Sequence, residues 1–218
     1  MFNKAAIWDL YTGDNPVKLV KKPRPQNQRE RFLSYEEARL LLSELEKASS
    51  QLHDIALVAL HCGVRAGEIF NMRGQDLDFY NQSIHIADPK NKYPRKTYMT
   101  KQVNAMLLRR SPTFPGEYVF KARDGGPIKG VSRIFTRTVG KIGLNDGIDD
   151  PRYKVVFHTL RHTFASWLAL NGETIQTIAE LLGHRTLAMT QRYSHLTGDH
   201  KKRAVLAMEK LFNNSLKN

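Results

Sequence analysis

Six residues spread over most of the chain carry the side chains that a tyrosine needs to cleave a phosphodiester without a metal ion. They are Arg65, Lys90, His158, Arg161, His184 and Tyr193. Attack on a phosphate builds negative charge on its non-bridging oxygens, and guanidinium groups can bind those oxygens bidentately while they stay protonated. We therefore assign the phosphate clamp to Arg65 and Arg161, with Glu68 in a supporting role that orients the clamp.

The other four side chains would move protons or bind the phosphate. A phenol has an unperturbed pKa of about 10, so Tyr193 as a nucleophile needs a neutral imidazole within hydrogen-bond reach, and His158 is the candidate base. The departing 5′ oxygen must be protonated, a role that suits the mobile ammonium group of Lys90. His184 would donate a hydrogen bond to the phosphate.

Helical patterns must position most of these groups. His158 and Arg161 stand three residues apart, which places them on one face of a helix. Gly183 ends an amphipathic helix and holds His184 at its end, and Tyr193 follows nine residues later on the next predicted helix. Each feature alone also has an ordinary structural interpretation, such as a surface histidine near a solvated arginine or a tyrosine in the core.

Together these segments resemble the signature boxes of the tyrosine recombinases, also called the phage integrase family. The second box of that family has His-x-x-Arg, then Leu-Gly-His, then the tyrosine, and the first box has an arginine in a Gly-x-Arg-x-x-Glu setting that begins here at Gly63. Between the boxes the family has a lysine in a β-hairpin, followed by an arginine that enters the next strand. The segment "DPKNKYPRKTYMT" offers Lys90, with Lys92 as its competitor. The resemblance covers about residues 32–196.

The resemblance implies site-specific recombination through a 3′-phosphotyrosyl link and a free 5′ hydroxyl, with no metal, cofactor or ATP. It implies double-stranded DNA sites as substrate, four protomers acting through a four-way junction, and accessory DNA-bending or directionality proteins. A phage or mobile-element integrase, serving viral genome integration, is the favoured subclass. Two alternatives stay open: a helix-turn-helix regulator built on "IAELLGHRTLAMTQRYSHL", which leaves Arg65 and His158 unexplained, and a type IB topoisomerase.

Composition agrees with a nucleic-acid partner. The 218 residues carry a formal net charge of +13 with a sequence pI of about 9.9, which suits binding to a polyanion. No apolar run approaches the roughly 18 residues needed to span a bilayer, and no secretory signal precedes Phe2. The single cysteine, Cys62, excludes an intramolecular disulfide framework and a cysteine-based zinc cluster. We expect a cytoplasmic protein.

The order of patterns predicts a mainly α fold with a small antiparallel β-sheet. We expect residues 1–14 to be the end of a missing N-terminal core-binding domain, 15–31 a basic linker, 32–198 the catalytic domain, and 199–218 a C-terminal helix and tail. That last helix has an apolar stripe, which we expect to pack in cis, whereas the resemblance implies that it docks onto a neighbouring protomer. Ser34 and Glu37 predict a capped helix start, and Gly63 a break between two helices. Strands are expected at 83–87 and 96–100, and further helices at 101–110, 129–142, 158–170, 174–182 and 186–195.

Two basic segments are candidates for DNA contact. The linker carries Lys18, Lys21, Lys22 and Arg24. The expected helix at 129–142 repeats a basic residue every fourth position, at Lys129, Arg133, Arg137 and Lys141. Apolar residues occupy another face of that helix, so one side would pack and the other would meet phosphates, although a solvated basic face is the alternative. The resemblance adds that a helix here enters the major groove, where Arg133 would touch bases.

Overall fold

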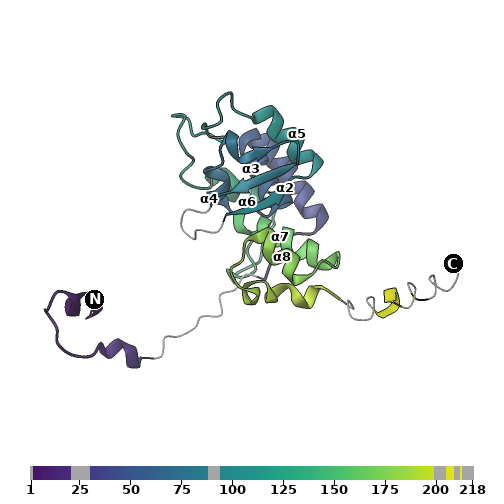
Figure 1. Ribbon diagram of the computed structural model, residues 1–218. Helices are drawn as coiled ribbons and strands as arrows, with labels where there is room; N and C mark the ends of the chain where they lie inside the picture. Colours follow the sequence, from purple (N-terminus) through teal and green to yellow (C-terminus); the bar gives the residue numbers. More distant parts are fainter. Residues whose placement is uncertain (1, 21–29, 88–93, 199–204, 209–211, 213–218) are drawn as a thin grey trace.

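Helices packed around a small antiparallel sheet form the body of the protein (Figure 1). The computed structural model describes residues 2–20, 30–87, 94–198, 205–208 and 212. The α-helices of the body are α2 (Tyr35–Ala48), α3 (Ser50–Cys62), α4 (Ala66–Phe70), α5 (Lys101–Arg110), α6 (Arg133–Lys141), α7 (Phe157–Leu170) and α8 (Ile175–Leu182). The remaining elements are the 3-10 helices η2 (Gly74–Asp76), η3 (Leu187–Met189) and η4 (Gln191–Leu196), and the strands β1 (Leu77–Asp78), β2 (Ser83–Ile86) and β3 (Arg95–Tyr98). The predicted fold class is confirmed.

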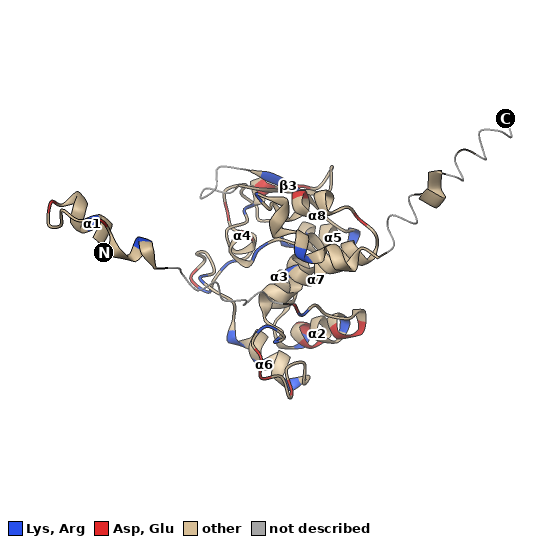
Figure 2. Cartoon of the chain, turned by 90° about the horizontal axis from the view of Figure 1, so that it is seen from below, with Lys and Arg blue, Asp and Glu red and all other residues tan. Residues whose placement is uncertain are grey.

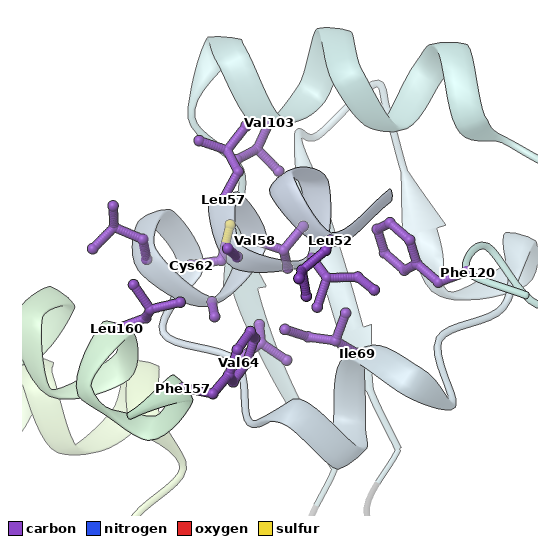
Figure 3. Packing of buried hydrophobic residues seen from close by; sticks show 14 of the residues in the cluster. Leu52, Leu57, Val58, Cys62, Val64, Ile69, Val103, Phe120, Phe157 and Leu160 are labelled. Atoms are coloured by element: carbon purple, nitrogen blue, oxygen red, sulfur yellow. The ribbon is translucent and has the colours of Figure 1, made fainter. Parts of the chain in front are cut away.

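Helix α3 is the centre of the hydrophobic core. Most of its side chains are buried, and Figure 3 shows them in one cluster with residues from α4, α5 and α7, including Ile69, Val103 and Leu160. The predicted break at Gly63 is confirmed: this residue ends α3 with φ +64°, a left-handed conformation that favours glycine. The chain then turns at once into α4, so the residues of the turn stay fixed to the core.

The sheet attaches the central hairpin to the same core. Its strand order is β1-β2-β3, all antiparallel, with Ile84 opposite Thr97 in the β2–β3 register. The hydroxyl of Thr97 donates to the carbonyl of Cys62 at 3.0 Å, which ties β3 to the end of α3. The two predicted strands are confirmed, whereas Lys90 and Lys92, in the turn that joins them, lie outside the described residues.

Helix α2 begins where the sequence predicts. The side chain of Ser34 accepts a hydrogen bond from the backbone of Glu37, and the Glu37 carboxylate accepts one from the backbone of Ser34, a reciprocal cap. The preceding residue, Leu33, is buried, and its backbone N–H donates to the hydroxyl of Thr163 on α7 at 3.0 Å. The start of α2 is therefore anchored to the helix that carries two of the predicted site residues.

Two predicted helices differ from the structure. The helix expected at 129–142 is shorter, because Ser132 caps α6 and leaves Lys129 in the preceding loop. The helix expected at 186–195 is a pair of 3-10 helices, η3 and η4, that meet at Thr190. Their backbone bonds span three residues, as in Tyr193 N–H to Thr190 carbonyl at 2.9 Å. This tighter winding turns side chains to directions that an α-helix would not give them.

The N-terminal segment adds two short helices, α1 (Phe2–Ile7) and the 3-10 helix η1 (Pro16–Leu19), which Figure 1 shows apart from the body. None of the residues of α1 is buried, and the apolar side chains of Ile7, Trp8 and Leu10 are exposed. Residues 205–208 are helical and exposed as well. Among the described residues, no helix has the length and apolar character required to cross a membrane.

Candidate active site

Arg65 is held at the start of α4 by the carboxylate of Glu68. As the residue that precedes the helix, Arg65 donates from its backbone N–H to Glu68 Oε2 at 2.9 Å and from Nη1 to Oε1 at 2.8 Å. Its side chain is 35% exposed, so part of the guanidinium still faces solvent. The carboxylate fixes one edge of this guanidinium and leaves donors on its other edge for a ligand.

Arg95 binds the same carboxylate from the first position of β3. Its Nη1 and Nη2 donate to the two oxygens of Glu68 at 2.9 and 2.6 Å, and its Nε donates to the carbonyl of Leu181 at 3.4 Å. Burial of Glu68 raises its pKa, but the hydrogen bonds and charge of Arg95, followed by the bonds from Arg65, outweigh burial and lower it to about 2. Glu68 is therefore an ionised carboxylate that holds two arginines together.

Arg161 projects from α7 and is almost fully buried. Its Nη1 donates to the carbonyl of Gly63 at 2.5 Å and its Nη2 to the carbonyl of Leu182 at 2.5 Å. These carbonyls lie at the C-terminal ends of α3 and α8, where helix dipoles favour a cation. Burial, and then the charge of Arg65, lower the pKa of Arg161 to about 9, so the side chain stays protonated at neutral pH.

His184 follows the left-handed Gly183 that ends α8, as the sequence predicts. Its Nδ1 lies 2.7 Å from the hydroxyl oxygen of the buried Thr190, between η3 and η4. Burial, and then the charge of Arg161, lower the pKa of His184 to about 4, so its imidazole is neutral at pH 7. In the tautomer in which the hydroxyl donates to Nδ1, the protonated Nε2 is available as a donor.

Tyr193 lies on η4 with its ring buried. Its hydroxyl is 2.6 Å from Nδ1 of His162, the residue after Arg161, whereas the sequence analysis proposed His158 as its base. The side chain of His158 is exposed, and its ring lies edge-on to that of His162 with centroids 4.7 Å apart. Burial raises the pKa of Tyr193, while the nearby charges of Arg192 and Arg161 act in the opposite direction.

The charge of Arg161 thus acts on His184 and Tyr193, and the charge of Arg65 acts on Arg161 and His184, so four separate segments contribute to one site. Sequence reasoning did not identify three residues of this site: Arg95, His162 and Thr190. A usable signal existed for Arg95, since the family pattern has an arginine that enters the strand after the hairpin. His162 and Thr190 gave no such signal, because only their contacts across the fold distinguish them.

The candidate DNA-contact residues are exposed where the structure describes them. Arg133 and Arg137 lie one turn apart on α6, whose opposite face buries Phe135 and Val139. Lys141, at the end of this helix, instead pairs with Glu44 of α2 at 2.6 Å. Lys129 is exposed in the loop before α6 and Lys18 is exposed on η1, whereas Lys21, Lys22 and Arg24 lie outside the described residues.

Comparison with known proteins identifies the family. The family model described as the phage integrase family matches residues 31–200. The chain is 29% identical over 213 residues to a tyrosine recombinase XerC of Anoxybacillus flavithermus, covering 91% of this chain and 69% of that protein. It is 27% identical over 210 residues to the integrase of Salmonella phage P22, covering 92% of this chain and 52% of that integrase, so it spans about half of this relative.

A solved structure shares the fold. The Tn1549 transposon integrase, in complex with transposon right end DNA, superposes with a TM-score of 0.68 at 23% identity, over 96% of this chain and 75% of that chain. The arrangement of helices around the small sheet is therefore a fold known from other proteins. This chain belongs to the phage integrase family and forms a tyrosine recombinase catalytic domain.

Proposed function

We propose that this chain breaks and rejoins double-stranded DNA at specific sites, with Tyr193 as the nucleophile that forms a 3′-phosphotyrosyl intermediate. The observation that carries the proposal is the charge of the cluster beside this tyrosine. Arg65, Arg95 and Arg161 bring three positive charges, and Glu68 supplies one negative charge. The remaining excess of about two charges, partly buried, is costly without an anion. A phosphodiester carries one negative charge and its transition state about two.

The clamp would bind the scissile phosphate before any bond breaks. In this proposal the exposed edge of Arg65 and the remaining donors of Arg161 hold the non-bridging oxygens. His184, neutral at pH 7, donates a hydrogen bond from Nε2 to the same phosphate, and the hydroxyl of Thr190 keeps that tautomer. These donors are positioned before the substrate arrives, which is the condition for strong transition-state stabilisation.

Chemistry would then proceed by in-line attack. The phenol oxygen of Tyr193 bonds to phosphorus, its proton passes to an imidazole of α7, and the bond to the 5′ oxygen breaks. Lys90, or Lys92, protonates that oxygen from the hairpin that follows β2. Because the phosphotyrosine retains the energy of the broken ester, a second strand can be joined without ATP or a metal ion.

DNA would lie across the face that joins the hairpin to α6. In the view of Figure 2, β3 and α6 lie toward opposite ends of the body, with α4 and α7 between them. A duplex that follows this face passes the start of α4, where the half-buried Arg65 lies, on its way from the hairpin to Arg133 and Arg137 of α6. The DNA complex of the Tn1549 integrase supports DNA as the substrate.

The proposal also includes assembly and origin. We propose that four copies of the chain act together on DNA, aided by accessory DNA-bending or directionality proteins. We propose further that the protein is encoded by a phage or mobile element and acts in a bacterial cytoplasm.

The rival interpretations make different demands. A helix-turn-helix regulator needs a recognition helix after α8, but two short 3-10 helices follow it, and the side chain of Tyr193 there is buried. A type IB topoisomerase would relax supercoiled DNA without exchanging partners.

A religation experiment tests the proposal and separates it from the rivals. Wild-type protein is incubated in EDTA, without ATP, with a pool of nicked duplexes, and a labelled strand with a 5′ hydroxyl, carried on a second duplex, is then added. A parallel reaction contains supercoiled plasmid. We expect SDS-resistant adducts that resolve into duplexes joined to the labelled strand. DNA binding without adducts would favour the regulator. Relaxation of supercoiled DNA without joining between two duplexes would favour the topoisomerase.

A further inference from the structure

The phenol of Tyr193 has a defined hydrogen-bond partner that the family pattern does not single out. Its oxygen lies 2.6 Å from Nδ1 of His162, and both side chains are more than nine-tenths buried. In the imidazole tautomer with a proton on Nε2, Nδ1 has a free electron pair aimed at the hydroxyl, so the phenol donates this bond. The two groups come from elements 31 residues apart in the chain, α7 and η4, and therefore meet only in the folded domain.

The geometry points to His162 as the residue that accepts the proton of Tyr193 when it attacks the phosphate. This inference rests on the proposed function, in which Tyr193 is the nucleophile. In this step the O–H bond of Tyr193 breaks, its proton bonds to Nδ1 of His162, and the oxygen bonds to phosphorus. The bond from phosphorus to the 5′ oxygen breaks in the same step, and that oxygen receives its proton from the hairpin lysine. His162 ends as an imidazolium ion.

Helix geometry explains how this imidazole can serve a phosphate held by Arg161. Successive residues of an α-helix are about 100° apart around the axis, so Arg161 and His162 lie on adjacent sides of α7. His158, one turn before His162, lies between those two directions, and its exposed ring contacts that of His162. The clamp and the proton acceptor therefore border the same stretch of helix, with His158 at the surface between them.

Burial favours His162 over His158 for this role. A phenol in a buried position cannot pass its proton directly to bulk water, and an acceptor already in contact with the hydroxyl needs no rearrangement before attack. His162 meets this condition at hydrogen-bond distance, whereas the side chain of His158 is exposed. His158 is then better suited to the phosphate or to the nearby backbone of the DNA.

The surroundings of His162 form a pocket of about 520 Å³ between α7, η4 and the segment before α2. The titratable and charged groups that border it, besides His158, are Tyr193, Arg192, His195, Glu30 and Tyr153. Glu30 accepts a hydrogen bond from the hydroxyl of Tyr153 at 3.0 Å, so this carboxylate is already engaged with another phenol. The attacking oxygen of Tyr193 is engaged with the imidazole of His162.

Single-turnover cleavage of a duplex selected by the wild-type protein tests the inference. A sulfur atom replaces the 5′ bridging oxygen at the scissile bond, because a departing thiolate needs no proton and the rate then reports the attack step. The variants are His162→Gln, which can accept the hydrogen bond but not a proton, and His162→Phe. Ser166→Ala, one helical turn later on the wall of the same pocket, is the matched control.

We expect both His162 variants to cleave on the order of 100-fold more slowly at pH 7, the usual contribution of a general base, while Ser166→Ala cleaves at the wild-type rate. The cleavage rate of His162→Gln should rise tenfold per pH unit up to pH 9, because its tyrosine depends on hydroxide to lose its proton. The cleavage rate of the wild type should level off at a lower pH. Cleavage by His162→Gln within about threefold of wild type would overturn proton acceptance. Equal loss in Ser166→Ala would assign the effect to packing, which also overturns it.

A second measurement keeps the inference independent of catalysis. Nitrogen-15 NMR of labelled histidine reports which ring nitrogen of His162 carries the proton. In the protein without DNA we expect the proton on Nε2. In Tyr193→Phe we expect the chemical shift of Nδ1 to change, because its hydrogen bond is lost. If the neutral imidazole of His162 carries its proton on Nδ1 in the protein without DNA, the inference is contradicted even if the variants cleave slowly. If wild-type protein forms no adduct with any duplex, the proposed function itself fails, which the same wild-type reaction reveals directly.

Discussion

Glu68 offers a quantitative test of the charge cluster, because one carboxylate holds both Arg65 and Arg95. The change Glu68→Gln keeps the size of the side chain and one oxygen acceptor but removes the negative charge. Two guanidinium groups near Arg161 then lose their shared counter-ion in a partly buried setting. Loss of one partner from such a cluster is far more destabilising than loss of an exposed ion pair.

The expected magnitude follows from the pKa of this carboxylate. A fall from the usual value of 4.5 to about 2, at about 1.4 kcal/mol per pH unit, corresponds to about 3 kcal/mol of stabilisation at neutral pH. Because the side chain is 14% exposed, solvent reduces this figure somewhat, and we expect Glu68→Gln to lose about 2–3 kcal/mol at pH 7. The folded-state pKa is depressed, so the stabilisation is complete above about pH 5 and is lost as the pH falls toward 2. At pH 3.5, about 1.4 kcal/mol of it is gone.

Urea unfolding at pH 7 and pH 3.5, followed by tryptophan fluorescence and circular dichroism, measures the loss of stability in Glu68→Gln at each pH. The control is Glu117→Gln, which removes an exposed pair with Lys121 and should cost less than about 1 kcal/mol at either pH. The difference between wild type and Glu68→Gln should narrow at the lower pH. A loss no larger than that of the control, or a loss independent of pH, would refute the account of this cluster.

Three further changes test other parts of the site. Gly183→Ala should cost about 1–2 kcal/mol, because φ is +64° and the new Cβ would lie 2.4 Å from Cδ of Arg95; an unchanged melting temperature would contradict this. Thr190→Val removes the hydrogen-bond partner of His184, so we expect cleavage to be about tenfold slower with unchanged DNA affinity. Thr190→Ser should restore the cleavage rate. A wild-type cleavage rate in the valine variant would exclude a positioning role for Thr190. Arg133→Ala should weaken binding to the cognate site more than to random DNA in a fluorescence anisotropy titration, and equal losses would exclude base recognition.

Local sequence signals predicted much of the fold because they act over a few residues. The reciprocal cap of Ser34 and Glu37, the left-handed turns at Gly63 and Gly183, and the two strands of the hairpin all follow from neighbouring residues. The winding of η3 and η4 was beyond this reasoning. Thr190 is fully buried there and paired with His184, a contact that periodicity does not encode.

The site was predictable in its residue types but not in its pairings. Glu68 and Arg95 are 27 residues apart, and they meet only in the folded domain, where β3 packs beside α8. His158 and His162 share one stripe of α7, so spacing could not tell which imidazole meets a tyrosine that arrives from another element. Pairings of this kind are determined by tertiary packing, and a single sequence carries no direct record of them.

The central claim is that Tyr193 becomes covalently joined to DNA. The chain has eight tyrosines, so the linkage must be located and not only detected. Wild-type and Tyr193→Phe protein are incubated with nicked duplexes, denatured and digested with trypsin and nuclease, and the peptides are sequenced by mass spectrometry. We predict a nucleotide attached through its 3′ phosphate to Tyr193 in the wild type and no adduct in the variant. An adduct on another residue, or an adduct that persists in Tyr193→Phe, would contradict the account.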